Sequence, residues 1–165
     1  MHSELARAMI AYEEGNASRI AHFMKVYAYS KMIGEAEGLD EKTQYILEAT
    51  ALVHDIGIKP AKEKYGSSAG PYQEKEGIPV ARKMLTNLGY EEDVVERVAY
   101  IVGHHHTYSD IDGLDYQILV EADFLVNLDE DHCEAKTIAS VKEKIFKTKT
   151  GIFYLEKIFK KVLDI

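Results

Sequence analysis

The chain has 165 residues, of which 46% are hydrophobic and 29% charged, and its formal net charge is −8. This length and composition predict one soluble globular domain and exclude a disordered or collagen-like chain. A single cysteine, Cys133, excludes an internal disulfide and a thiolate metal site, and the absence of an apolar leader or membrane-spanning run predicts a cytoplasmic protein without a membrane partner.

The hydrophobic pattern in the first part of the chain predicts three helices and no strand. They cover about residues 3–15, 16–36 and 40–57. Their capping residues are Ser3 for the first, Asn16 or Ser18 for the second and Asp40 for the third. Gly57 and Pro60 close the third helix. Apolar side chains lie on most sides of the second and third helices, which is typical of helices in the centre of a bundle.

The following segment, residues 58–73, contains turn residues without a sustained period. It predicts a long loop, of the kind that often forms a lid or a binding loop. Further helices are predicted at about residues 75–88, 91–102 and 115–128, with Asp115 as the cap of the last. Residues 134–165 predict one or two amphipathic helices that are broken near Gly151. The sequence therefore predicts an all-α protein with a single domain over residues 1–165.

Charge is distributed unevenly along the chain. Residues 1–133 hold 12 basic and 24 acidic side chains, whereas residues 134–165 hold 8 and 4. The acidic body argues against non-specific nucleic-acid binding, which requires a basic face. For the basic end, the simplest interpretation is packing helices with a solvated lysine face. The alternative is a docking surface for an acidic partner or an identical subunit, so a homo-oligomer remains open.

Three of the apolar helices each carry residues that are costly to bury alone. These residues are His22, His54 with Asp55, and Asp123. A cation is one partner that would stabilise them, and a mixed set of imidazoles and carboxylates suits Mn, Fe, Co, Ni or Zn, with Mg also compatible. Taken singly, each residue has a simpler explanation. A histidine in a helix is more often a packing residue, and Asp123 could pair with Arg19, Arg82 or Arg97.

Together these motifs resemble the HD-domain superfamily of metal-dependent phosphohydrolases. The resemblance rests on Arg19-x-x-His22, on Ala-Leu-Val-His54-Asp55-Ile-Gly, on the histidines after Val102, and on Glu-Ala-Asp123-Phe-Leu-Val. It covers about residues 18–130. It implies a bundle of about six to eight helices in which His22, His54, Asp55 and Asp123 bind one divalent metal. The amphipathic segment 134–165 lies beyond it.

One departure from the family pattern concerns a second metal ion. Binuclear members have a further histidine four residues before a glycine, whereas here Gln73 stands at that distance from Gly77. Because Gln is a poor ligand for the second metal, we expect one ion. His104 and His105 resemble late histidines of binuclear members and could hold a second ion or a phosphate, or simply lie in a solvated loop. His106 is expected to face inward least, and His2 and His132 to lie on the surface.

The resemblance implies hydrolysis of a small phosphate ester, with a nucleotide among the candidates, by a metal-bound water. We expect Asp55 to bind the metal and orient the water, and His104 or His105 to donate a proton. Arg19 could bind the phosphate or pair with a buried acid, and Lys59 and Lys62 could hold the substrate or be merely solvated. Two alternatives are a di-iron HD-type oxygenase, against which Gln73 argues, and a non-catalytic module that senses a nucleotide or a metal.

Overall fold

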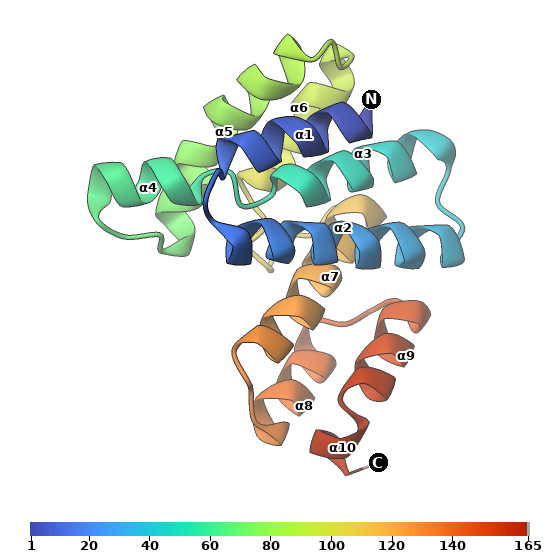
Figure 1. Cartoon of the computed structure of the whole chain (residues 1–165). Coiled ribbons are helices and arrows are strands. Elements are labelled where there is room, and N and C mark those ends of the chain that lie inside the picture. The colour runs from blue at the N-terminus through green and yellow to red at the C-terminus, as the bar shows by residue number, and fades with distance from the viewer. Residues whose placement is uncertain (165) are drawn as a thin grey trace.

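The computed structural model describes residues 1–164, and this part of the chain is helical without strands (Figure 1). The helices are α1 (His2–Tyr12), α2 (Ala17–Ala36), α3 (Glu41–Val53), α4 (Ile58–Tyr65), α5 (Gly70–Asn87), α6 (Glu92–Val102), α7 (Leu114–Glu130), α8 (Ala135–Lys144), α9 (Lys149–Ile158) and α10 (Lys160–Leu163). No helix among the described residues is both long and apolar enough to cross a membrane. The predicted all-α fold is confirmed, with α4 and α10 as additional short helices.

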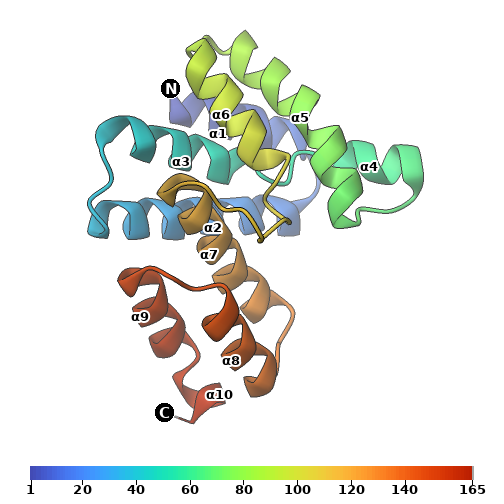
Figure 2. The ribbon, with the colours of Figure 1, turned by 180° about the vertical axis from the view of Figure 1, so that it is seen from behind.

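The helices α2, α3 and α7 form the centre of the bundle. α2 packs against α3, and α7 packs against both, while α1 and α6 cover α3 and α5 packs on α6 and α4 (Figures 1 and 2). Phe23 of α2, Leu47 of α3 and Leu119 of α7 are all buried in the shared core. The central position of α2 and α3 therefore explains why apolar residues occupy most sides of these two helices.

The segment expected to be a long loop is mostly helical, which corrects the sequence prediction for residues 58–73. It contains α4, a short connection at residues 67–69, and the start of α5 at Gly70. Pro60 lies in the first turn of α4, where the missing N–H leaves no helical hydrogen bond unmade. Gly66 ends α4 with a positive φ of 67°. Proline and glycine here mark the two ends of a helix rather than a loop.

Two other helix boundaries also differ from the prediction. Asp115 lies inside the first turn of α7, where its carboxylate binds Arg97 at 2.8 and 2.9 Å, and Gly113 takes the cap position. Gly151 lies inside α9, and the interruption between α8 and α9 comes before it, because Thr148 is the N-cap of α9. The contact made by Asp115 is with a distant residue, whereas α9 begins with a local cap, in which the Thr148 side chain accepts a hydrogen bond from the backbone N–H of Gly151.

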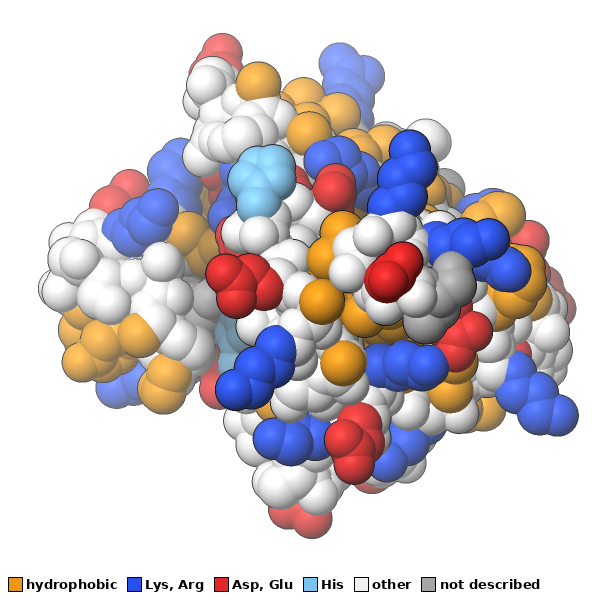
Figure 3. Space-filling model, turned by 90° about the horizontal axis from the view of Figure 1, so that it is seen from below, with side chains coloured by type: hydrophobic (Ala, Val, Ile, Leu, Met, Phe, Trp, Pro, Cys, Tyr) orange, Lys and Arg blue, Asp and Glu red, His pale blue; other side chains and the backbone are white. Residues whose placement is uncertain are grey.

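Glu121 of α7 attaches the C-terminal helices to the centre of the bundle. Its carboxylate is fully buried and accepts hydrogen bonds from Thr148 Oγ1 at 2.7 Å and from Gln117 Nε2 at 2.7 Å. The backbone N–H groups of Lys147 and Thr148 donate to it as well. Beyond this anchor, the face around the C-terminus has lysine side chains interspersed with exposed apolar ones (Figure 3).

We expect Thr148→Val to lower the free energy of unfolding by about 2 kcal/mol. The threonine hydroxyl donates to Glu121 and also accepts from the backbone N–H of Gly151 at 2.9 Å, which caps α9. Valine keeps the shape and removes both bonds. Urea denaturation measures the change, and Thr137→Val on the exposed side of α8 is the matched control. Equal stability of the two variants would contradict this role for Thr148.

His2 does not lie free on the surface, which corrects another prediction. Its ring stacks on Tyr45 with a centroid distance of 4.3 Å and lies 6.0 Å from the ring of Tyr90. Its Nδ1 lies 2.9 Å from the Tyr90 hydroxyl. Burial is the main cause that lowers the pKa of His2 below its usual 6.5. His2, in the first turn of α1, is therefore a neutral histidine that packs against these two tyrosines. His132, in contrast, is exposed as expected.

The stabilisation supplied by His2 should depend on pH. Because the pKa is lowered in the folded chain, the unfolded chain takes up the proton first, and the stabilisation is complete above pH 6.5 and declines below it. We therefore expect the difference in unfolding free energy between the parent and His2→Phe to become smaller, or to reverse, as the pH falls from about 7 to 5. Urea denaturation at several pH values measures it. A difference independent of pH would contradict a neutral His2.

Candidate metal centre

Three central helices deliver the four candidate metal ligands to one place. His22 lies in the second turn of α2, His54 and Asp55 follow the last turn of α3, and Asp123 lies in the middle of α7. All four are buried, with at most 7% of any residue exposed. One donor atom from each lies within 4.8 Å of the others. The packing of α2, α3 and α7 thus produces a cluster from residues up to 101 positions apart in the chain.

The ligand atoms of this cluster point toward a common centre. Nε2 of His22 lies 3.1 Å from Oδ1 of Asp123 and 3.2 Å from Oδ2 of Asp55. Nε2 of His54 lies 3.3 and 3.2 Å from the same two oxygens. Two imidazole nitrogens and two carboxylate oxygens from separate carboxylates therefore surround one point. This donor set fits a divalent transition metal.

Contacts outside the cluster hold the candidate ligands in this orientation. Nδ1 of His54 donates to the carbonyl oxygen of Ala51 at 2.7 Å, and Nδ1 of His22 donates to Glu130 at 2.5 Å, so both Nε2 atoms point inward. Asn127 donates to Asp123 at 3.0 Å. Sequence reasoning missed Glu130 and Asn127. The spacing of four residues between Asp123 and Asn127 was a usable signal, whereas Glu130 meets His22 only through the packing of α7 on α2.

The charges of the cluster balance one another. Burial acts to lower the pKa of His22, but the carboxylates of Asp123 and Asp55 bind its ring and raise the pKa to about 9. Burial acts in the same direction on His54, and the two carboxylates again raise its pKa. Burial would raise the pKa values of Asp55 and Asp123, yet the nearby histidines hold both below the usual range. The four shifts have one cause, the close approach of imidazoles and carboxylates, which favours the charged form of each, and a bound cation would replace the inward-facing protons of the two rings.

Arg19 reaches the cluster from its solvent side. Its guanidinium donates to Oδ2 of Asp55 at 2.6 Å, so the pairing with a buried acid that the sequence left open occurs in the structure. Lys59 and Lys62 are exposed on α4 and, with Arg19, line one surface pocket. Lys59 donates to the carbonyl oxygen of Tyr12 at 3.2 Å. The three basic residues expected near the substrate therefore share one side of the metal centre.

The three consecutive histidines after α6 point in different directions. His105 is buried, with Nε2 3.3 Å from Oδ1 of Asp55, and Nδ1 donates to the carbonyl oxygen of Val102. His106 joins Asp55 and His105 in a second group of donor atoms within 4.8 Å. His104 instead stacks on the exposed ring of Tyr100 with a centroid distance of 4.0 Å.

The placement of His106 corrects the sequence prediction that it faces inward least, and of the two candidates His104 and His105 only His105 lies against Asp55. The reason is local, because the chain leaves α6 in a tight turn over residues 103–106, where side-chain direction follows neither helical nor strand periodicity. Burial and the neighbouring His105 lower the pKa of His106 to about 4. Its Nε2 is buried without a hydrogen-bond partner among residues 1–164.

Gln73, the residue that departs from the family pattern, lies directly beside the His54–Asp55 turn. A Cβ atom on Gly57 would come 2.0 Å from its carbonyl oxygen, so α5 touches the backbone that follows Asp55. The side chain is buried, Nε2 donates to Ser68, and Oε1 has no partner among the described residues. The expectation of a single metal ion stays a prediction, because the group of Asp55, His105 and His106 offers further donor atoms.

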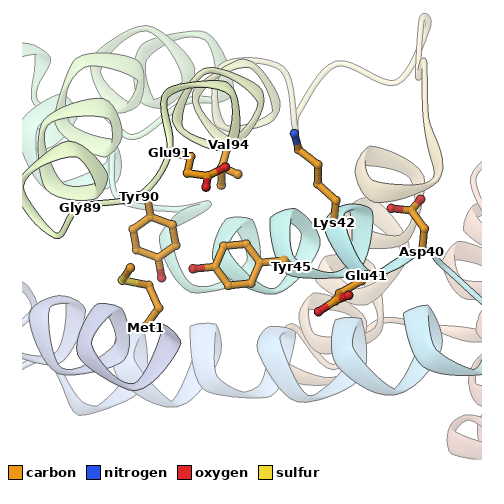
Figure 4. Close-up of a pocket in the computed structure, with 9 residues that line it drawn as sticks. All are labelled: Met1, Asp40, Glu41, Lys42, Tyr45, Gly89, Tyr90, Glu91 and Val94. Atoms are coloured by element: carbon orange, nitrogen blue, oxygen red, sulfur yellow. The ribbon is translucent and has the colours of Figure 1, made fainter.

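A larger surface pocket, of about 620 Å³, lies elsewhere on the molecule, between the start of α1, the start of α3 and the α5–α6 turn (Figure 4). The side chains of Tyr45 and Tyr90 project into it, and Glu91 and Lys42 lie at its rim. None of the residues that the sequence singled out for metal, substrate or catalysis lines this pocket. The candidate functional residues therefore gather at the buried cluster and not at this hollow.

Comparison with known proteins agrees with this geometry. A family model described as the HD domain matches residues 19–146, which include all four clustered residues. Among solved structures, the chain is similar to a predicted HD superfamily hydrolase from an uncultured Thermotogales bacterium, with 23% identity, a TM-score of 0.71 and coverage of 98% of this chain and 87% of that one. That likeness shows the fold, and no functionally curated protein matches the chain. Because the HD-domain family model matches most of the sequence, the chain belongs to the HD-domain family.

Proposed function

We propose that the protein is a metal-dependent phosphohydrolase that acts on a small phosphate ester. The observation that carries this proposal is the convergence of four buried donor atoms, from three helices, within 4.8 Å. Membership of the HD family supports divalent metal binding at this cluster. The similar solved structure is described as a predicted hydrolase, which supports the same reaction class. The single cysteine supports a reducing compartment, and we include a cytoplasmic location in the proposal.

His22, His54, Asp55 and Asp123 would hold the metal ion. A bound divalent ion supplies a Lewis acid that activates water and polarises the phosphate. Asp55 joins this cluster to the neighbouring side chains, since Oδ2 faces His22, His54 and Arg19. Its other oxygen, Oδ1, faces His105. In this proposal Asp55 therefore orients the attacking water and accepts its proton.

His105 is placed to donate a proton to the leaving oxygen. Its Nδ1–H is bound to the carbonyl oxygen of Val102, so any further proton on the ring is held at Nε2, which faces Asp55 Oδ1 at 3.3 Å. Arg19 uses one nitrogen for Asp55, and its remaining N–H groups can bind phosphate oxygens. His104 points away from this arrangement, so we assign the proton donor to His105 alone.

A screen of phosphate esters tests the proposal. The protein is incubated with Mn²⁺, Fe²⁺, Co²⁺, Ni²⁺, Zn²⁺ or Mg²⁺ and a panel of nucleotides, sugar phosphates and simple alkyl phosphates, and released phosphate is measured. We expect release with at least one metal, and none above background with Asp55→Ala purified in the same way. No release with any metal and ester would contradict the proposal. Two irons per chain with oxygen consumption would favour the di-iron oxygenase instead.

A further inference from the structure

A pocket of about 400 Å³ opens next to the metal centre, between the α1–α2 turn and α4. We call it the Glu13 pocket, and its walls include Tyr12, Glu13, Arg19, Lys59 and Lys62. Figures 1 and 2 show the α1–α2 turn beside the start of α4. Arg19 is shared between the two sites, because it lines the pocket and donates to Asp55 at 2.6 Å. A ligand in the pocket would therefore extend to the metal centre.

Glu13 stands out among the buried acids of residues 1–164. Only 6% of Glu13 is exposed, yet its carboxylate has no hydrogen bond or ion pair within the described chain. Each of the other buried acids has partners. Glu48 accepts from Gln44, Asp115 binds Arg97, Glu121 accepts from Thr148, and Asp55 and Asp123 belong to the metal cluster.

Burial raises the pKa of Glu13, although Arg19 and Lys59 act against this. Because Glu13 lines the pocket and its carboxylate has no partner among residues 1–164, both oxygens are available to accept hydrogen bonds from a ligand there.

The surroundings of Glu13 are fixed by contacts to the metal centre. The hydroxyl of Tyr12 donates to the carbonyl oxygen of Ile56, the residue after Asp55, at 3.0 Å. Lys59 donates to the carbonyl oxygen of Tyr12, and its ammonium lies 5.0 Å from the centre of the Tyr12 ring. The pocket wall and the His54–Asp55 turn are thus held in a fixed relation. Tyr12 and Glu13 precede the region that the HD family model matches, so this wall is additional to the matched core.

We propose that the Glu13 pocket binds the hydroxyl-bearing part of the substrate, and that the substrate is a phosphorylated sugar or polyol. The proposal rests on the phosphohydrolase function above and extends it to a substrate class. Carboxylates accept hydrogen bonds from sugar hydroxyls, as in dinucleotide-binding sites. The acids Glu13, Glu14 and Glu63 and the bases Arg19, Lys59 and Lys62 line the pocket in equal number, so its charges balance and a neutral, hydroxyl-bearing group suits it. A neutral hydroxyl satisfies Glu13, while the phosphate reaches Arg19 and the metal centre.

A comparison of two ligands with the same phosphate tests this inference. Ribose 5-phosphate carries hydroxyls, and propyl phosphate carries none. Binding to the full-length protein is measured by calorimetry with and without Mn²⁺, and phosphate release is followed in parallel samples. We expect the parent to bind ribose 5-phosphate about tenfold more tightly or better, and Glu13→Gln to lose most of this preference. Glu92→Gln, an equal charge change at an exposed site on α6, should keep the preference.

The outcomes separate the pocket from the reaction. A parent without preference for ribose 5-phosphate, including one that binds neither ligand, overturns the inference, as does a preference that survives in Glu13→Gln. Phosphate release without a binding preference for ribose 5-phosphate would leave the phosphohydrolase proposal standing. A binding preference for ribose 5-phosphate without phosphate release would contradict the proposed reaction and support the proposed role of the pocket. Glu13→Gln keeps the shape of the side chain at a position that lines the pocket, so it should melt close to the parent, and lost affinity would not reflect unfolding.

Discussion

Replacing Asp55 by asparagine should lower the rate of metal-dependent phosphate release by about a hundredfold or more. Residues that merely support metal ligands contribute up to about a hundredfold to affinity or activity, and a ligand contributes at least as much. The asparagine side chain would lack the negative charge that the metal requires at this position. It would also offer only one oxygen, whereas Asp55 uses Oδ2 toward His22 and Oδ1 toward His105.

The control for this prediction is Asp110→Asn, which removes the same charge from an exposed position and should retain full activity. Circular dichroism and the melting temperature establish that Asp55→Asn remains folded. A variant with more than about a tenth of the parent activity, at saturating metal, would show that Asp55 is neither a ligand nor the residue that orients the water.

Gly57→Ala should destabilise the protein by about 3 kcal/mol. Gly57 has an ordinary φ of −75°, so its requirement is space and not backbone freedom. A Cβ atom at this position would lie 2.0 Å from the carbonyl oxygen of Gln73 and 2.8 Å from the backbone nitrogen of Gly77. Backbone atoms inside a packed helix cannot rotate away, so α5 must shift as a whole. Chemical denaturation measures the loss of stability.

Gly103→Ala provides the comparison for Gly57→Ala. There the added Cβ meets Cδ1 of Ile78 at 2.5 Å, which is the far end of a side chain that can change rotamer. We expect Gly103→Ala to cost less than half as much as Gly57→Ala. Equal losses for both variants, or a loss below about 0.5 kcal/mol at Gly57, would contradict the close approach of α5 to the His54–Asp55 turn.

The sequence was sufficient to predict the four clustered residues because each is a polar side chain on a helix that is otherwise apolar. Burial of His22, His54, Asp55 and Asp123 followed from the position of their helices in the bundle. The family resemblance grouped the same four independently. Their roles as metal ligands stay predictions until a metal is measured.

Other features depend on tertiary contacts that periodicity does not report. His106 rather than His104 faces Asp55 because of a tight turn, and His2 is covered by tyrosines from α3 and the α5–α6 turn. Pro60 by itself is compatible both with the end of one helix and with the first turn of the next, and in the structure it lies in the first turn of α4. Glu13 showed no signal in the sequence, since its burial results from the approach of α4 to the α1–α2 turn.

Metal content is the most direct test of the metal centre. The parent and the double variant His54→Gln/Asp123→Asn are dialysed against one divalent transition metal at a time, and the bound metal is measured by elemental analysis. We predict at least one ion per chain in the parent, for one or more of the metals, and none in the folded double variant. A parent that retains no metal, or a double variant that retains as much as the parent, would contradict a metal centre at His22, His54, Asp55 and Asp123.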